Sequence, residues 1–396
     1  MIVLGIESSC DETAASVAQD GSVLLSSVVF SSMDLHKVYG GVVPEIAARS
    51  HVESIIPVIE QALAEAFDPN TKPEHRSGET NQKSEIRNTK QAAALLKSNI
   101  KHLESIDPWD KIDAIAVTYG AGLGGSLLVG VMTARSLAAA KDKPLYAINH
   151  VEAHVYANFL TVTGDAPSVQ GYSLPAKQPE FPVMALIVSG GHTQLALFQD
   201  HFDYILLGQT RDDAIGEAFD KVAKIIGLPY PGGPSVAAAA KHGDAHKYKL
   251  PKARLDKKYE FSFSGLKTAV LRLAQQEIGQ DFTFPSHQVP DKLSETQRHD
   301  IAASFQRTAI ETVVDKTVLA YEEFMPKSVV IAGGVAASQE LRKQLADRLP
   351  IDINFTDPKL CTDNGAMIAT LGCYKAMLNQ PKADPYTLQI EPNLSM

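Results

Sequence analysis

The sequence contains little cysteine. Its 396 residues include only Cys10, Cys361 and Cys373, and no two of them form a CxxC pair. A zinc ribbon needs paired cysteines and a disulfide framework needs an even, larger set, so neither is expected. So few cysteines are typical of proteins from a reducing compartment, and we expect a cytoplasmic protein.

Long apolar runs are also missing. No stretch approaches the roughly 18 uninterrupted apolar residues of a membrane span, and residues 1–7 carry neither a basic region nor a cleavage site typical of a targeting leader. A net charge of -9 argues against binding to nucleic acid or membranes through overall charge, so RNA would need a local basic patch. The chain is long enough for about two to three domains with cores of their own.

Two familiar nucleotide motifs are absent. The chain has no GxxxxGK[ST] loop, and no GxGxxG joins its first strand to a helix, so it has neither a P-loop nor a Rossmann fingerprint. Instead, turns rich in glycine or hydroxyl groups follow three predicted strands, around Ser8 and Ser9, at 189–191, and at 333–334. Glycine lets the backbone approach a phosphate closely. Each turn alone is weak evidence, but together they favour a nucleotide site.

A repeated pattern indicates the fold class. Residues 2–6 are predicted to form a buried strand, followed by a polar turn and a second strand at 14–17, and the same arrangement recurs over 183–198. This repeat predicts an α/β protein of two similar lobes that face each other across a central cleft.

The predicted domain boundaries follow from this repeat. The first lobe comprises residues 1–149 and 364–396, with a polar insertion at about 68–107 whose part 91–106 has the pattern of an amphipathic helix. The second lobe comprises residues 150–363, with an irregular insertion at about 161–182, and carries the metal and nucleotide motifs.

A histidine pair indicates a metal site. His150 and His154 are four residues apart, a spacing that points both imidazoles to one face of a helix. Asp363 is the obvious third ligand, although an aspartate there could instead be the N-cap of the last helix. Two histidines and one carboxylate suit Fe(II) or Zn(II). Glu152 points away from the imidazole face, so the HExxH arrangement of metallopeptidases is absent.

Two further segments have alternative interpretations. The helical pattern at 212–223 places Asp213, Glu217 and Asp220 near one face, which is typical of a solvated acidic surface, and the glycines after it at 232–233 permit close approach to a ribose or adenine. A basic run with interleaved aromatic residues follows, and it either binds an RNA backbone and stacks bases or is a solvated loop; it contains Lys252, Arg254, Lys257, Lys258, Tyr259, Phe261 and Phe263.

These segments together resemble one family, the tRNA N6-adenosine threonylcarbamoyltransferases of the bacterial and organellar type, formerly described as O-sialoglycoprotein endopeptidase-like. The resemblance covers nearly the whole chain in the family's order. The matching runs are 5–13, 41–45, 150–154, 188–193, 216–221, 230–234, 261–267, 332–335 and 362–369.

The resemblance implies the actin-like ATPase fold of sugar kinases and heat-shock chaperone ATPases. It implies one Fe(II) per subunit, with Zn(II) as a possible substitute, held by His150, His154 and Asp363. The substrate-binding residues it implies are Ile187, Val188, Ser189, Gly190, Gly191, Asp220, Gly233 and Ser338. Ser338 and Ala153 depart from the family, which usually has asparagine and glycine at these positions.

The reaction implied moves the threonylcarbamoyl group of threonylcarbamoyl-AMP to the N6 amine of the adenosine 3′ of the anticodon, position 37, in tRNAs that read codons beginning with A, and releases AMP. Glu12, at the tip of the first hairpin, is a candidate to orient the group or take a proton. The partners implied are tRNA, a paralogous dimerisation subunit and a small P-loop ATPase. The alternatives are a metallopeptidase, an ATPase of the same fold, and a non-catalytic partner subunit.

Overall fold

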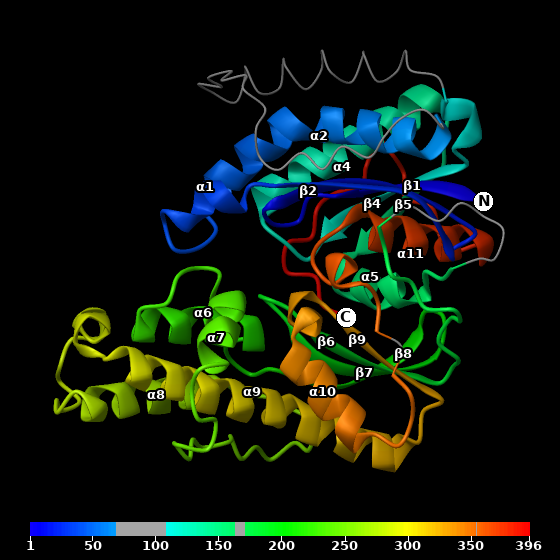
Figure 1. Ribbon diagram of the computed structural model, residues 1–396. Helices are drawn as coiled ribbons and strands as arrows, with labels where there is room; N and C mark the ends of the chain where they lie inside the picture. Colours follow the sequence, from blue (N-terminus) through cyan, green and yellow to red (C-terminus); the bar gives the residue numbers. More distant parts are fainter. Residues whose placement is uncertain (69–107, 163–170, 354) are drawn as a thin grey trace. The chain divides into compact units, whose positions relative to one another are not determined.

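The computed structural model describes residues 1–68, 108–162, 171–353 and 355–396 (Figure 1). Within them the chain forms two compact units: Met1–Gln178 with Thr362–Met396, and Pro179–Cys361. The amphipathic helix expected at 91–106 and all but the first residue of the insertion at 68–107 lie outside the described residues, as does part of the insertion at 161–182. None of the described helices is long and apolar enough to cross a membrane.

The first unit is built on one mixed sheet with the strand order β3-β2-β1-β4-β5. Strands β1, β2 and β3 are antiparallel neighbours, whereas β4 and β5 extend the sheet in parallel from β1. The elements are β1 (Ile2–Glu7), β2 (Glu12–Gln19), β3 (Val23–Ser31), α1 (Met33–Lys37), α2 (Pro44–Phe67), β4 (Ala114–Gly120), α4 (Gly124–Lys141), β5 (Leu145–Asn149), α5 (His150–Tyr156) and α11 (Gly365–Met377).

Helices cover both faces of this sheet, α2 and α4 one face, α5 and α11 the other (Figure 1). The central strands β1 and β4 are therefore mostly apolar, and β1 is buried over its last five residues. Helix α5 packs against α11 of the same unit. The contacts thus place residues 150–178 in the first unit, whereas the sequence analysis assigned them to the second lobe.

Helix α11 approaches β1 unusually closely. A Cβ atom on Gly5 would lie 2.3 Å from the backbone nitrogen of Ala369, and one on Gly372 would lie 2.5 Å from the Cβ of Ala116. Real Cβ atoms do not come so near to other atoms, so only glycine fits at these positions.

The second unit repeats the plan with the strand order β8-β7-β6-β9, in which β6, β7 and β8 are antiparallel neighbours and β9 is parallel to β6. The elements are β6 (Val183–Val188), β7 (Thr193–Asp200), β8 (Asp203–Gln209), α6 (Ile215–Ile226), α7 (Gly232–Ala240), α8 (Ser264–Glu277), α9 (Glu295–Phe324), β9 (Ser328–Ala332) and α10 (Gln339–Arg348). The predicted α/β fold with a duplicated hairpin is confirmed. The actin-like ATPase class remains what the family resemblance implies. The cleft expected between the lobes stays a prediction.

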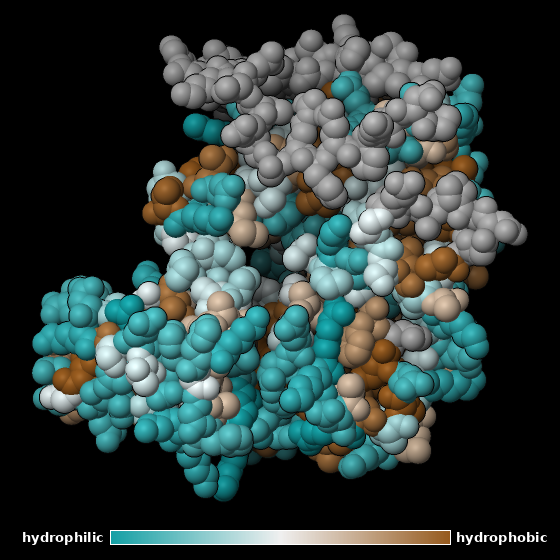
Figure 2. Space-filling view, viewed as in Figure 1, coloured by the Kyte–Doolittle hydropathy of each residue, from teal (hydrophilic) through white to brown (hydrophobic). Residues whose placement is uncertain are grey.

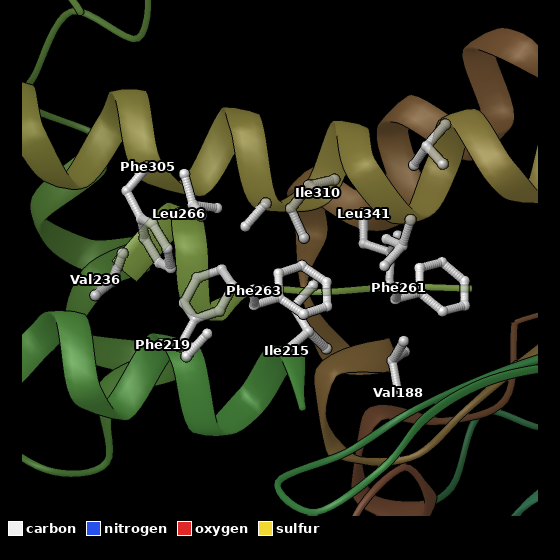
Figure 3. Close-up of a cluster of buried hydrophobic side chains, with 14 of the residues drawn as sticks. Val188, Ile215, Phe219, Val236, Phe261, Phe263, Leu266, Phe305, Ile310 and Leu341 are labelled. Carbon is white, nitrogen blue, oxygen red and sulfur yellow. The ribbon is translucent and has the colours of Figure 1, made fainter. Parts of the chain in front are cut away.

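Aliphatic side chains and several phenylalanines form the core of the second unit (Figure 3). Phe219 of α6 and Phe305 of α9 meet edge to face with ring centroids 4.9 Å apart, and Phe261 and Phe263 beside them are fully buried. The polar sides of α8 and α9 face outward in Figure 2, where hydrophilic residues cover these helices.

The burial of these rings removes the base-stacking interpretation of the basic run. Phe261 and Phe263 have no exposed surface, and the neighbouring lysines are engaged in ion pairs. Lys252 pairs with Glu311 and Asp315, and Lys258 with Glu323, all on α9. These ion pairs hold the basic run against α9, and its buried phenylalanine rings cannot stack on RNA bases.

The close approach of α11 predicts a large effect of one methyl group. We expect Gly5→Ala to lower the free energy of unfolding by about 1–3 kcal/mol or more, because the added Cβ collides with backbone atoms that cannot move aside. Gly41→Ala is the matched control, since a Cβ there meets no atom within 4 Å. Urea denaturation measures both; equal midpoints for the two variants would contradict the packing described here.

Candidate metal centre and nucleotide pocket

Helix α5, which carries both histidines, follows strand β5 directly in the chain. Asn149, the last residue of the strand, caps the helix, because its Oδ1 accepts hydrogen bonds from the backbone N–H groups of Val151 (2.9 Å) and Glu152 (3.3 Å). The predicted spacing holds: the imidazoles of His150 and His154 lie on one face with centroids 4.7 Å apart. Both side chains are buried, His154 with only 1% of its surface exposed.

Asp363 completes the predicted triad. Its Oδ1 lies 3.4 Å from Nε2 of His150 and 3.3 Å from Nε2 of His154. The N-cap of α11 is Asn364, whose Oδ1 accepts from the backbone N–H of Met367 at 3.0 Å, so the interpretation of Asp363 as the cap is wrong. The carboxylate faces the histidines instead, and one ligand atom from each residue lies within 4.8 Å of the others.

The chemistry of the triad fits a transition metal. Both ring nitrogens of His154 are buried without a hydrogen-bond partner among the described residues, since the 3.3 Å approach to Asp363 lacks hydrogen-bond geometry. Leaving such groups unpaired is costly, and a cation bound at Nε2 would satisfy one of them. Imidazole nitrogen with one carboxylate oxygen is a donor set of Fe(II) and Zn(II) sites.

Glu7 supports the first histidine. This fully buried carboxylate at the end of β1 lies 3.1 Å from Nδ1 of His150 and accepts hydrogen bonds from Thr118 Oγ1 (2.6 Å) and the backbone N–H of Ser9 (2.5 Å). A proton on Nδ1 leaves Nε2 free to bind a metal. Sequence reasoning gave Glu7 no role, although an acid at the end of a buried strand is itself a signal.

The charges of this cluster are strongly coupled. Burial raises the pKa of the Asp363 carboxyl, but His150 and His154 outweigh it and hold that pKa below its usual range. Burial likewise opposes the charge on Glu7, and His150 still lowers its pKa. For His150, burial lowers the pKa, and Asp363 and Glu7 raise it well above the ordinary value. Both carboxylates therefore remain charged at neutral pH.

Glu12 lies within the electrostatic field of the triad. Its carboxylate accepts a 3.2 Å hydrogen bond from Ser31 Oγ, and burial, Asp11 and Asp363 raise its pKa well above the ordinary value. Glu152, by contrast, is buried near Lys375, and burial raises its pKa against the pull of that lysine. Its Oε1 makes no hydrogen bond among the described residues, and no contact joins it to the imidazoles there.

A separate pocket of about 600 Å³ lies within the second unit. Its volume is in the range of sites for small organic ligands. Four of the predicted substrate residues line it, namely Gly190, Asp220, Gly233 and Ser338, and Lys241 and Gln306, which sequence reasoning missed, line it too. Ile187, Val188, Ser189 and Gly191 do not line it, and the first two are fully buried in β6.

Local contacts hold the pocket residues in place. Oδ1 of Asp220 accepts a 2.6 Å hydrogen bond from the backbone N–H of Gly232, and burial raises the pKa of this carboxyl. Gly233 has open space where a Cβ would be, so its backbone is accessible from the pocket. Ser338 is the N-cap of α10 and accepts from the backbone N–H of Leu341 at 3.4 Å. Glu217, on the same helix as Asp220, pairs with Lys221 instead.

Comparison with known proteins identifies the family. The family model for tRNA N6-adenosine threonylcarbamoyltransferase matches residues 23–75 and 105–370. A protein of that name from Thermomicrobium roseum is 44% identical over 383 residues, 95% of this chain and 92% of its own. Another from Caldicellulosiruptor saccharolyticus is 42% identical over 399 residues, 100% of this chain and 98% of its own.

The family match, found in a chain with a duplicated α/β fold and a histidine-carboxylate cluster, defines this protein as a transferase. The chain belongs to the tRNA N6-adenosine threonylcarbamoyltransferase family, and it is a transferase of tRNA modification, as predicted.

The triad predicts selective metal loss. We expect wild-type protein reconstituted with Fe(II) without oxygen to retain about one ion per chain, and His154→Ala to retain little, because a three-ligand site loses a ligand. His242→Ala, in the second unit, is the control and should match wild type. Elemental analysis after gel filtration measures the stoichiometry. Equal iron content in all three proteins would show that the ion binds outside the triad.

Proposed function

We propose that this chain transfers the threonylcarbamoyl group of threonylcarbamoyl-AMP to N6 of adenosine 37 in tRNAs that read codons beginning with A, with release of AMP. The observation that supports this most directly is the triad of His150, His154 and Asp363 in a chain matched nearly end to end by this family. The alternatives, an ATPase of the same fold or a non-catalytic partner subunit, have no use for a buried pair of imidazoles facing a carboxylate.

The pocket of the second unit is the proposed site for the adenylate part of the donor. An adenylate brings one adenine, one ribose and one phosphate, and so requires no P-loop lysine. The backbones of Gly190 and Gly233 permit close approach, while Asp220 and Ser338 offer a carboxylate and a hydroxyl for hydrogen bonds to the ligand. We also propose backbone contacts from residues 187–191, the end of β6 and the turn after it, as the resemblance implies.

The proposed metal is Fe(II), with Zn(II) as a substitute. Bound by His150, His154 and Asp363, it supplies a Lewis acid for the carbonyl of the threonylcarbamoyl group. Glu7 holds the ring of His150 in the orientation that directs Nε2 toward Asp363. The adenosine N6 then forms a bond to the carbonyl carbon, the bond from that carbon to the phosphate oxygen breaks, and AMP leaves with the electron pair.

The attacking amine must lose a proton, and Glu12 is the proposed group to orient the donor or accept that proton. Burial, Asp11 and Asp363 raise its pKa well above the ordinary value, and a carboxylate of raised pKa is the stronger base.

The proposed partners are tRNA, a paralogous dimerisation subunit and a small P-loop ATPase, with no role for a membrane. The proposed location is the cytoplasm. These proposals come from the family resemblance, and the small number of cysteines agrees with a reducing compartment.

The transfer itself is the first test. In a single turnover with radiolabelled threonylcarbamoyl-AMP and unmodified tRNA, we expect His150→Ala and Asp363→Ala to slow transfer by at least about 100-fold, because the carbonyl loses its electrophilic support. Glu217→Gln, an exposed change on α6, should transfer normally. Normal rates in both triad variants would rule out this mechanism and favour the ATPase or partner-subunit alternatives.

Nucleotide binding is tested separately. We expect Asp220→Ala to weaken binding of AMP by about 10-fold, the loss of roughly one hydrogen bond to a charged group. Glu217→Ala is the matched control on the same helix. Isothermal titration calorimetry measures both, and an unchanged dissociation constant for Asp220→Ala would remove this residue from the site.

A further inference from the structure

The C-terminal segment, residues 383–396, runs along the first unit beside the ends of its parallel strands. Its backbone is tied at several points: Ala383 donates to the carbonyl of Leu145 (2.7 Å), and Glu391 donates to that of Tyr119 (2.7 Å). The carbonyl of Pro392 accepts from Gly122 at 3.1 Å. Ala383, Leu388 and Ile390 pack against the core of the first unit, whereas most of the last six residues are exposed, so polar contacts hold that end of the segment.

Arg135 of α4 holds the beginning of this segment. Its guanidinium donates three hydrogen bonds to backbone carbonyls, from Nε to Pro385 (2.6 Å), from Nη2 to Tyr386 (2.5 Å) and from Nη1 to Leu388 (3.1 Å). The planar fork of arginine presents several donors at once, which a lysine cannot do. One side chain thus fixes the path of the segment ahead of residue 390.

Asn149 receives the end of the segment. Its Nδ2 donates to the carbonyl of Ser395 at 3.0 Å, while Oδ1 of the same amide caps α5. The bond to Ser395 therefore fixes the amide plane that starts the helix carrying both histidines. The segment also packs closely against the end of β4, because a Cβ on Gly120 would lie 2.1 Å from the carbonyl oxygen of Glu391.

We propose that Arg135 and Asn149 are positioning residues that act through the C-terminal segment: they fix the start of α5 and so set the affinity of the histidine triad for its metal. This inference rests on the proposed metal site. The route is continuous, since Arg135 holds the segment, the segment holds the Asn149 amide, and that amide precedes His150 directly. Residues that orient metal ligands from outside the ligand set commonly change affinity by 10–100-fold.

The test uses Co(II) as the probe, titrated against a competing chelator with the full-length protein. We expect Arg135→Gln, and a chain that ends at Leu394, to bind Co(II) about 10-fold more weakly. A chain that ends at Ser395 is the matched control, because it keeps the acceptor for Asn149. Arg348→Gln, which removes an ion pair of the second unit with Asp315, controls for loss of an arginine.

Hydrogen exchange of the metal-free proteins gives a second readout. The amides of Val151 and Glu152 should exchange faster in Arg135→Gln and in the chain that ends at Leu394, and at the wild-type rate in both controls. Variants that melt earlier but keep wild-type Co(II) affinity and α5 exchange would show that the segment is only structural, which overturns the inference. Faster α5 exchange with no Co(II) bound by wild type would instead uphold the positioning of α5 and refute its link to a metal.

Discussion

The packing of α11 on β1 and β2 is the contact on which the first unit depends. Nearly every residue of this helix is buried. A Cβ on Gly5 would collide with backbone atoms of the helix, and one on Gly372 would collide with the side chain of Ala116, so neither position accepts a side chain. Helix α11 also packs against α5, although the whole second unit lies between these two helices in the sequence. Asp363 lies just before α11, so the helix that closes the unit also places the third residue of the triad beside the two histidines.

The buried charges of the centre impose a second constraint. Glu7 and Asp363 both keep depressed pKa values although burial opposes their charge. With neutral imidazoles, as metal ligation requires, these two carboxylates carry a charge of about -2 in a site with little solvent. A divalent cation bound at the proposed site would balance that charge.

The sequence predicted what local patterns determine. The duplicated hairpin, the helical spacing of His150 and His154 and the identity of Asp363 all follow from periodicity or residue chemistry. What it missed depends on long-range contacts. Helix α5 belongs to the first unit because of α11, far away in the chain. Phe261 and Phe263 look exposed beside lysines, yet they are buried against α6 and α9. The contact of Glu7 with His150 joins residues 143 positions apart.

Ser338 shows how one departure from the family pattern is tolerated. The residue is the N-cap of α10 and also lines the pocket, so it serves the helix and the ligand site at once. Serine and asparagine are comparable N-caps, and the exchange therefore costs the helix little. The serine side chain is shorter and has fewer hydrogen-bonding groups than asparagine, so it can form fewer hydrogen bonds to a ligand in the pocket. Gly190, Asp220 and Gly233 line the same pocket and are the other residues proposed to bind the nucleotide, so the departure concerns one of several proposed contacts.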